Sequence, residues 1–234
     1  MMPLTIFEAS EGFCPFPEPE DVFAERVAEH AELLLPLATV DLALVDPELE
    51  GTVHFILPIE PDDGCVGEGG DAAFNSLCRE NWLGYRYSGG RCVVATGFDF
   101  FLLPRLRGAS TRLADLNAHY AETRAGFARQ RAEFQERGAL YHPGLEPSAD
   151  SRVALAALGG HAPGGNWTVT DFPLVRATGG AADRPSSLPL TEDGRAFRYI
   201  GAVDAYRYAL THDCALLLFF DPETRTALTT FDWS

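Results

Sequence analysis

The sequence predicts an α+β protein with a mainly antiparallel sheet, one long amphipathic helix and room for two packed lobes. Three observations lead to this fold class. Apolar residues follow helical spacing over residues 110–137, short apolar–polar alternations recur on both sides of that segment, and turn-forming residues separate them. With 234 residues and a hydrophobic content of 46%, the chain can bury a core without disulfides or metal.

The first third predicts an extended segment, a helix and a hairpin, in that order. Three prolines within residues 13–20 exclude a helix there. Residues 21–35 carry an acidic first turn and a helical apolar stripe, and Pro36 is expected to end this helix. Residues 39–45 and 52–58 alternate apolar and polar side chains around a turn-forming linker, which predicts a β-hairpin.

A short helix and a bent strand are expected next. Residues 71–80 follow a glycine-rich loop and are predicted to be helical. Residues 91–103 are rich in β-branched and aromatic side chains, which favour a strand, with a break at Gly97 and an end at Pro104.

The long helix is predicted over residues 110–137. Its apolar side chains recur at every seventh position, at Leu113, Tyr120, Phe127 and Phe134. Because this spacing also occurs in coiled coils, a seam for a partner helix is an alternative. The polar residues between these positions favour packing against the protein's own sheet.

The rest of the chain is expected to be rich in sheet. A connection with many Pro and Gly residues follows the long helix and predicts an acidic N-terminal α+β lobe, residues 1–144, and a C-terminal lobe, residues 145–234. The C-terminal lobe is expected to contain four strands. These are residues 166–170, 197–204, 215–221 and 226–231.

The C-terminal third carries motifs that resemble the YwqG-like family of bacterial proteins, whose function is not established. The matching residues are Gly159, Gly160, Pro163 and Trp167, the run from Pro189 to Gly201 (PLTEDGRAFRYIG) and the run from Leu216 to Asp221 (LLLFFD). The resemblance implies a sheet-rich α+β fold for this C-terminal lobe. It supplies no catalytic residue.

The formal charge of −16 is concentrated in the first third. Residues 1–70 contain 16 acidic residues and one basic residue, Arg26, whereas the remainder is nearly neutral. An acidic surface repels phosphate backbones, so we expect no nucleic acid partner. The same surface would attract a basic protein and raise its rate of encounter.

The acidic loop near residue 65 and the aromatic segment after it form the predicted partner-binding site. Carboxylates pair with Arg and Lys, and Trp and Tyr are common interface anchors. The predicted partner-binding residues are Glu60, Asp62, Asp63, Glu68, Asp71, Trp82 and Tyr85. Alternatives are a solvated acidic loop, burial of the aromatic side chains in the core, and Ca²⁺ coordination, for which the carboxylate spacing does not fit an EF-hand.

The sequence predicts no catalytic residue, no metal ligand and no cofactor. Five cysteines without a Cys-x-x-Cys pair and six dispersed histidines give no zinc pattern. The run His212-Asp213-Cys214 offers a nucleophile, a base and an acid, but neighbouring residues of an extended chain point to opposite faces.

Two functions are therefore weighed. The first is a non-catalytic binding protein for a basic protein partner, such as an immunity or antitoxin-type inhibitor of a toxin. The alternative is a hydrolase or another small-molecule enzyme whose site is assembled from distant residues. No apolar run is long enough for a membrane span and the first residues do not resemble a secretory signal, so we expect a cytoplasmic bacterial protein. The oligomeric state stays open.

Overall fold

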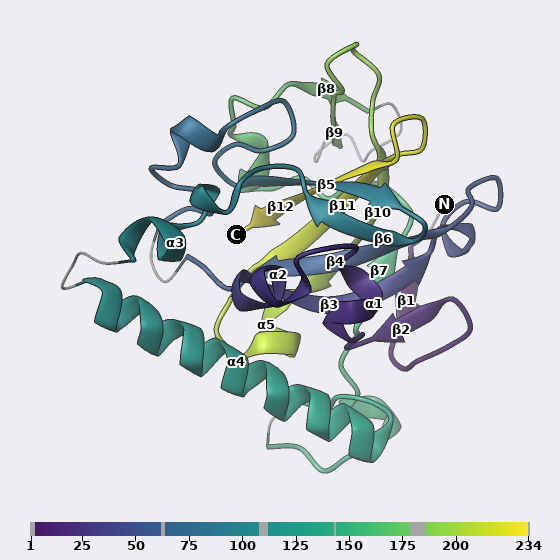
Figure 1. Ribbon diagram of the computed structural model, residues 1–234. Helices are drawn as coiled ribbons and strands as arrows, with labels where there is room; N and C mark the ends of the chain where they lie inside the picture. The colour runs from purple at the N-terminus through teal and green to yellow at the C-terminus, as the bar shows by residue number, and fades with distance from the viewer. Residues whose placement is uncertain (1–2, 62–63, 108–111, 143, 178–185, 234) are drawn as a thin grey trace.

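The computed structural model describes residues 3–61, 64–107, 112–142, 144–177 and 186–233 (Figure 1). In this part of the chain the strands form three sheets, and every strand pair is antiparallel. One helix, α4 (Arg112–Arg137), is much longer than the others. These features confirm the predicted α+β class. None of the helices described combines the length and the apolarity that a membrane crossing needs.

The remaining elements follow one another closely along the chain. The strands are β1 (Leu4–Ile6), β2 (Phe13–Pro15), β3 (Leu34–Asp41), β4 (Thr52–Pro58), β5 (Trp82–Ser88), β6 (Arg91–Val94), β7 (Ala156–Leu158), β8 (Leu174–Arg176), β9 (Ser187–Pro189), β10 (Arg198–Asp204), β11 (Ala215–Asp221) and β12 (Thr226–Asp232). The shorter helices are α1 (Pro19–Val22), α2 (Val27–Leu33), α3 (Leu102–Leu106) and α5 (Ala205–Ala209). The 3-10 turns are η1 (Leu42–Leu44), η2 (Asp71–Ala73), η3 (Phe98–Phe100), η4 (Ala149–Ser151) and η5 (Asn166–Thr168).

The seven-stranded sheet takes its strands from both parts of the chain. Its order is β1-β7-β10-β11-β12-β5-β6, so strands from the C-terminal part lie between β1 and β5. The sheet therefore does not follow the predicted division into lobes 1–144 and 145–234. Neither segment contains this sheet on its own, because β12 must pair with both β11 and β5.

Strand β11 lies in the middle of the large sheet and is buried on both faces. Leu216 and Leu218 belong to the main hydrophobic core, which also includes the three-stranded sheet β2-β3-β4. Leu217 and Phe219 belong to a second cluster on the opposite face, together with Trp82 and other aromatic residues. Burial on both faces explains why this strand reads as a continuous apolar run.

The three-stranded sheet contains a hairpin of β3 and β4, and β4 matches its predicted range. The first strand is Leu34–Asp41 and not the predicted 39–45, because residues 42–44 form the turn η1. The helix predicted at residues 21–35 is divided into α1 and α2, because Arg26 between them adopts a left-handed conformation with φ of 48°. Strand β3 begins at Leu34 and continues through Pro36, so this proline does not end the helix. The bulge between Pro36 and Ala38 accommodates a residue that cannot donate a ladder hydrogen bond.

The long helix confirms the predicted segment, and its apolar stripe faces the protein interior. Leu116 and Tyr120 are buried, and Phe127 contacts Phe16 with 5.3 Å between ring centroids. In Figure 1, α4 runs along one side of the molecule with α5 between it and the sheets. The stripe thus packs within the chain, as the polar positions between its residues indicate.

Three further local predictions differ from the structure. Residues 166–170 begin with the turn η5 and are not a strand, and residues 71–80 contain only the turn η2. Residues 91–103 form β6 only over Arg91–Val94 and then turn into η3 and α3. Pro104 lies in the first turn of α3, where a missing N–H costs no helical hydrogen bond.

Strand β5 is absent from the predicted elements because its glycine obscures the strand pattern. An ideal Cβ on Gly84 would lie 2.5 Å from Leu77 Cβ. Glycine is therefore required here by a close approach of the chain, not by a turn. The strand lies inside the sheet, between β12 and β6, and Trp82 is its first residue.

Candidate binding site

Glu60 is an internal residue of the fold. Its side chain is 3% exposed and accepts hydrogen bonds from the Leu102 and Leu103 backbone N–H groups, at 2.7 and 3.5 Å, and from the Tyr120 hydroxyl at 3.0 Å. Burial raises the pKa of this carboxyl. The prediction that Glu60 contacts a partner is therefore corrected, because its oxygens already hold the start of α3 and the side of α4.

Trp82 and Tyr85 are also not available at the surface. Both side chains are completely buried, Trp82 in the second cluster and Tyr85 in the main core. Of the alternatives weighed for the aromatic residues, core burial holds for these two. Glu68 and Asp71 are exposed, as a contact with a partner requires. Asp62 and Asp63 lie outside the described residues.

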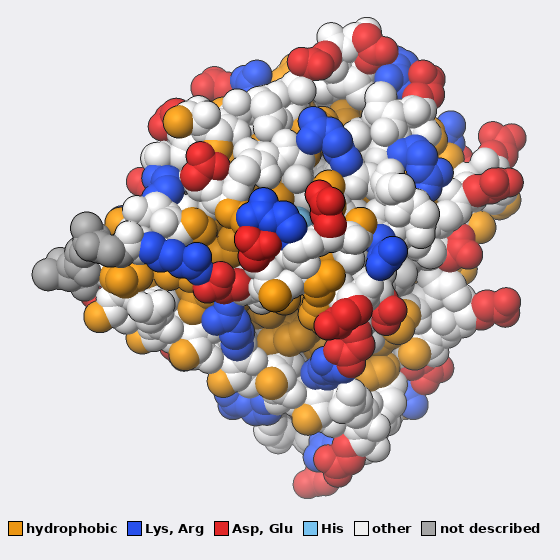
Figure 2. Space-filling model, viewed as in Figure 1, with side chains coloured by type: hydrophobic (Ala, Val, Ile, Leu, Met, Phe, Trp, Pro, Cys, Tyr) orange, Lys and Arg blue, Asp and Glu red, His pale blue; other side chains and the backbone are white. Residues whose placement is uncertain are grey.

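The acidic residues of the first third do not form a uniform acidic face. Four of them pair with arginines that come from later parts of the chain: Glu8 with Arg152, Glu18 with Arg131, Glu32 with Arg107 and Asp46 with Arg198. A fifth, Glu29, pairs with Arg26. Figure 2 shows acidic and basic side chains interspersed over the face it displays. The charge asymmetry of the sequence is thus reduced in space.

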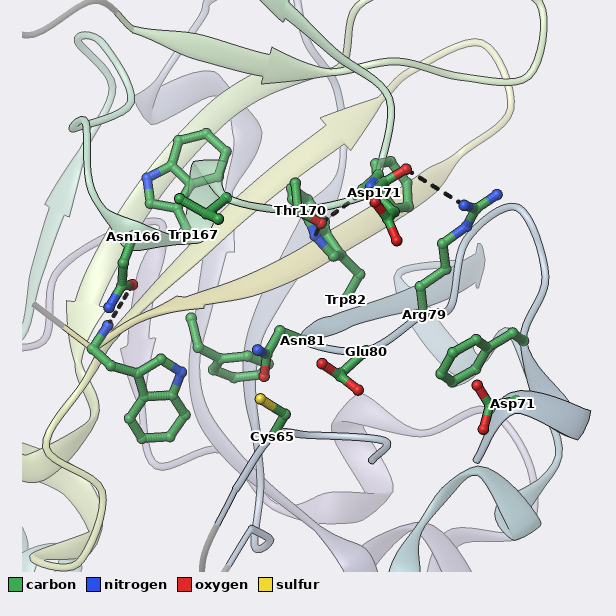
Figure 3. Close-up of a pocket in the computed structure, with 15 residues that line it drawn as sticks. Cys65, Asp71, Arg79, Glu80, Asn81, Trp82, Asn166, Trp167, Thr170 and Asp171 are labelled. Carbon is green, nitrogen blue, oxygen red and sulfur yellow. Dashed lines mark hydrogen bonds between the residues drawn. The ribbon is translucent and has the colours of Figure 1, made fainter. Parts of the chain in front are cut away.

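A large cavity lies beside Trp82, and three distant segments form it. These segments are the loop that precedes β5, the turn η5 with the residues after it, and the end of β12. The cavity has a volume of about 790 Å³, within the range of small-molecule and side-chain pockets. All three tryptophans of the chain, Trp82, Trp167 and Trp233, line it, and Figure 3 labels the first two. We call this cavity the tryptophan pocket.

The aromatic wall of the tryptophan pocket is held in place by packing and hydrogen bonds. Trp82 stacks on Phe172 with 4.4 Å between ring centroids and meets Trp167 edge to face at 6.0 Å. The Trp82 indole N–H donates to Thr170 Oγ1 at 2.9 Å, and the Trp167 indole N–H donates to the Pro163 carbonyl at 2.8 Å. Since both polar edges are satisfied, the wall is already formed without a ligand.

The mouth of the tryptophan pocket exposes apolar side chains. Val169 is 87% exposed and Trp233 is 37% exposed. The Trp233 backbone N–H donates to Asn166 Oδ1 at 3.1 Å, which ties the end of β12 to η5. Exposed apolar groups beside a concave site are typical of a surface that another molecule covers.

The charged lining of the tryptophan pocket is mainly acidic. Among the described lining residues, three are carboxylates, Asp71, Glu80 and Asp171, and one is a guanidinium, Arg79. Arg79 lies 6.0 Å from the centroid of the Phe172 ring and makes a long 3.5 Å hydrogen bond to the Asp171 carbonyl. Figure 3 shows Glu80 and Cys65 directed toward the centre of the pocket. The electrostatic environment therefore favours a cation.

The chemistry of the tryptophan pocket favours binding over nucleophilic catalysis. Cys65 is half-buried, and burial raises the pKa of its thiol, so it is protonated at neutral pH. The described lining residues include no histidine that could act as its base. Within the described residues, no group of three or more His, Cys, Asp or Glu side chains could hold a metal ion.

The run His212-Asp213-Cys214 shows no catalytic arrangement either. His212 and Cys214 are buried while Asp213 is exposed. Burial lowers the pKa of His212 to about 4 and raises that of Cys214 to about 12, so both are neutral at pH 7. His212 contacts the Thr211 hydroxyl through Nδ1 at 2.9 Å and faces His119, with 5.5 Å between ring centroids, and its ring contact is therefore not with Cys214.

Sequence reasoning identified only part of the tryptophan pocket. Trp82 and Asp71 were predicted site residues, and Trp167 is part of the family resemblance, but Glu80 and Asp171 were not singled out. These residues lie about 90 positions apart, and only the tertiary fold brings them to one cavity. One signal in the sequence could have indicated the site. The chain has only three tryptophans, and all three line this pocket.

No protein-family model, no curated protein and no solved structure matches the chain. The resemblance to the YwqG-like family therefore stays a prediction. The function has to be inferred from the residues of the site.

Proposed function

We propose that this chain is a non-catalytic binding protein that receives a cationic side chain of a basic protein partner in the tryptophan pocket. One observation carries the proposal: a preformed cavity has walls of tryptophan and phenylalanine and a lining with three carboxylates against one guanidinium. An immunity protein that inhibits a basic toxin belongs to this class of function.

Aromatic rings and carboxylates together suit an arginine or lysine side chain. A guanidinium or ammonium gains from the face of a tryptophan ring by a cation–π interaction. Trp233, which is 37% exposed, is the tryptophan that offers such a face, because Trp82 and Trp167 are buried. It also forms strong charge-assisted hydrogen bonds with carboxylates. Arg79 already lies over Phe172 at the edge of the pocket, which shows the kind of contact that an incoming cation could make.

The overall charge supports the same partner. The net charge of −16 attracts a basic protein over distances of about a Debye length, roughly 8 Å at physiological ionic strength. Five acidic residues of the first third are paired with arginine, so we expect the specific contact to lie in the tryptophan pocket. The long-range attraction then affects mainly the association rate.

Tryptophan fluorescence gives a direct test, because every tryptophan of the chain lines the pocket. The full chain is titrated with a hexa-arginine peptide, and with a hexa-glutamate peptide as the comparison. We expect a saturable change in emission with hexa-arginine alone, and weaker binding as the salt concentration rises. A basic peptide that binds only elsewhere on the acidic surface leaves the emission unchanged, and that result would reject the proposal.

Charge-neutralising variants locate the contact. Glu80→Gln and Asp171→Asn should each weaken hexa-arginine binding by about tenfold, the effect of losing one charge-assisted hydrogen bond. Glu20→Gln is the matched control, because it removes the same charge from an exposed position in α1, outside the pocket. Equal weakening in all three variants would mean that binding follows only the net charge, and it would remove the pocket from the proposal.

A further inference from the structure

The second region that suggests a ligand lies where α4 packs against α5. Thr123 Oγ1 and Thr211 Oγ1 are 3.0 Å apart, and the Gln130 side-chain amide donates to the Arg207 carbonyl at 2.8 Å. Between these contacts, an ideal Cβ on Gly126 would lie 2.0 Å from the Ala209 carbonyl oxygen, so the two backbones touch there. Residues 123, 126 and 130 of α4 thus contact residues 211, 209 and 207, respectively, so the two segments run in opposite directions.

Beyond Gln130, this packing leaves a cavity of about 320 Å³ between the two helices and the segment that follows α4. Three arginines line it: Arg129 and Arg137 from α4, and Arg207 from α5. Its apolar lining includes Val153, which is buried, and Leu210. We call this cavity the arginine pocket.

The charges of the arginine pocket are only partly compensated. Glu133 is the one acidic residue among its described lining residues, and it lies 3.5 Å from Arg137. Arg207 pairs with Asp204 at 3.0 Å. Arg129 makes no ion pair with any described residue. Other arginines pair with acidic residues of the N-terminal third. Such pairing does not account for a positive pocket in a protein of charge −16, and a negatively charged ligand would account for it.

We propose that the arginine pocket binds a small organic oxyanion, a phosphate monoester or a carboxylate, whose apolar body rests on Val153 and Leu210. Arginine presents several N–H donors in a planar fork and is suited to both oxyanions. Tyr141 and Tyr206, which also line the cavity, add hydroxyl groups and aromatic surface. The volume limits the ligand to a size near the lower end of the range for small molecules. This site is independent of the tryptophan pocket.

Calorimetric titration of the full chain tests the proposal with three probes: inorganic phosphate, phenyl phosphate and benzoate. We expect one binding site for phenyl phosphate or for benzoate, and the tighter of the two identifies the oxyanion. Inorganic phosphate should bind more weakly than phenyl phosphate, because it cannot use the apolar lining. Absence of binding by all three probes at near-physiological ionic strength would overturn the proposal.

Three arginine variants then locate the site. Arg129→Gln and Arg207→Gln should each weaken binding by about tenfold or more. Arg91→Gln is the control, because Arg91 is an exposed arginine on β6 outside the cavity and its replacement changes the net charge equally. Circular dichroism spectra and melting temperatures establish that each variant is folded. Binding that Arg129→Gln and Arg207→Gln leave unchanged, or that Arg91→Gln weakens as much, would contradict the assignment.

Discussion

The Tyr120 hydroxyl donates a hydrogen bond to Glu60 Oε1 at 3.0 Å, inside the protein and 60 positions away along the chain. Glu60 follows strand β4, Tyr120 lies in α4, and the same carboxylate accepts backbone hydrogen bonds from the start of α3. One buried carboxylate thus joins a strand end to two helices. Removing one of its donors leaves a buried acceptor unsatisfied, and this lowers the free energy of unfolding.

Tyr120→Phe should destabilise the protein by about 1–3 kcal/mol, because Glu60, which is 3% exposed, then loses the hydroxyl donor. Urea unfolding followed by circular dichroism measures the change. Tyr206→Phe, at an exposed position of α5, is the control and should change the free energy of unfolding by less than about 0.5 kcal/mol. Equal effects of the two substitutions would show that the Glu60 contact contributes nothing.

Ionisation of Glu60 should make stability depend on pH. Burial raises its pKa in the folded protein above the ordinary value of 4.5, so the folded state binds this proton more tightly than the unfolded state does. Its contribution to stability is therefore complete below pH 4.5 and is lost as the pH rises through the folded pKa.

A glutamine at position 60 isolates this effect. We expect the stability of the wild-type protein, relative to Glu60→Gln, to fall as the pH rises above 4.5, as measured by denaturant unfolding at each pH. Glu25→Gln, an exposed carboxylate, should show no such trend. A rise with pH in place of the fall would mean that the hydrogen bonds to the carboxylate outweigh its burial.

The ionisation of His54 should make stability depend on pH in the opposite direction to that of Glu60. Its ring is buried, lies between Thr39 Oγ1 and the Gly90 carbonyl at 2.9 Å each, and its pKa is lowered by burial from 6.5 to about 4. The contribution of His54 to stability is therefore complete above pH 6.5, and about 3 kcal/mol of it is lost as the pH falls toward 4. His54→Gln should remove this part of the acid loss, while the part due to His212, whose pKa burial also lowers to about 4, remains. The exposed substitution His161→Gln should retain both parts in unfolding measurements at both pH values.

Gly126→Ala should destabilise the protein although alanine is the better helix former. The added methyl would meet the Ala209 carbonyl at 2.0 Å and force α4 from α5. The cost lies at the upper end of about 1–3 kcal/mol and exceeds the gain of about 1 kcal/mol in helix propensity. Ala125→Gly, at an exposed neighbouring position, measures propensity alone. A higher melting temperature for Gly126→Ala would show that the helices are not in contact there.

The elements that sequence reasoning found are those whose own residues determine them. The long helix has a repeated apolar stripe, and β11 and the β3–β4 hairpin have apolar runs bounded by turn residues. The helix predicted at residues 21–35 fails at Arg26, whose backbone is left-handed and whose guanidinium lies over the distant Phe98 ring. Strand β5 was missed because Gly84 is required by packing against Leu77, which no local pattern records.

The same distinction holds for the sites. The charge asymmetry can be read from the sequence, but the arginines that pair with Glu18 and Asp46 lie 113 and 152 positions away. Glu60 is buried because Tyr120 and the start of α3 surround its carboxylate. These contacts cannot be read from the residue type, which on its own suggests an exposed position. Both pockets combine segments that approach one another only in the folded chain.

The interleaved order of the large sheet has a consequence for biosynthesis. A ribosome makes β5 and β6 well over a hundred residues before β12, which must lie next to β5. Until then the emerging polypeptide carries an unpaired, apolar edge at β5, a surface prone to association with other nascent chains. Completion of this sheet is thus a late event, and its timing in the cell would depend on the speed of translation and on protection by chaperones.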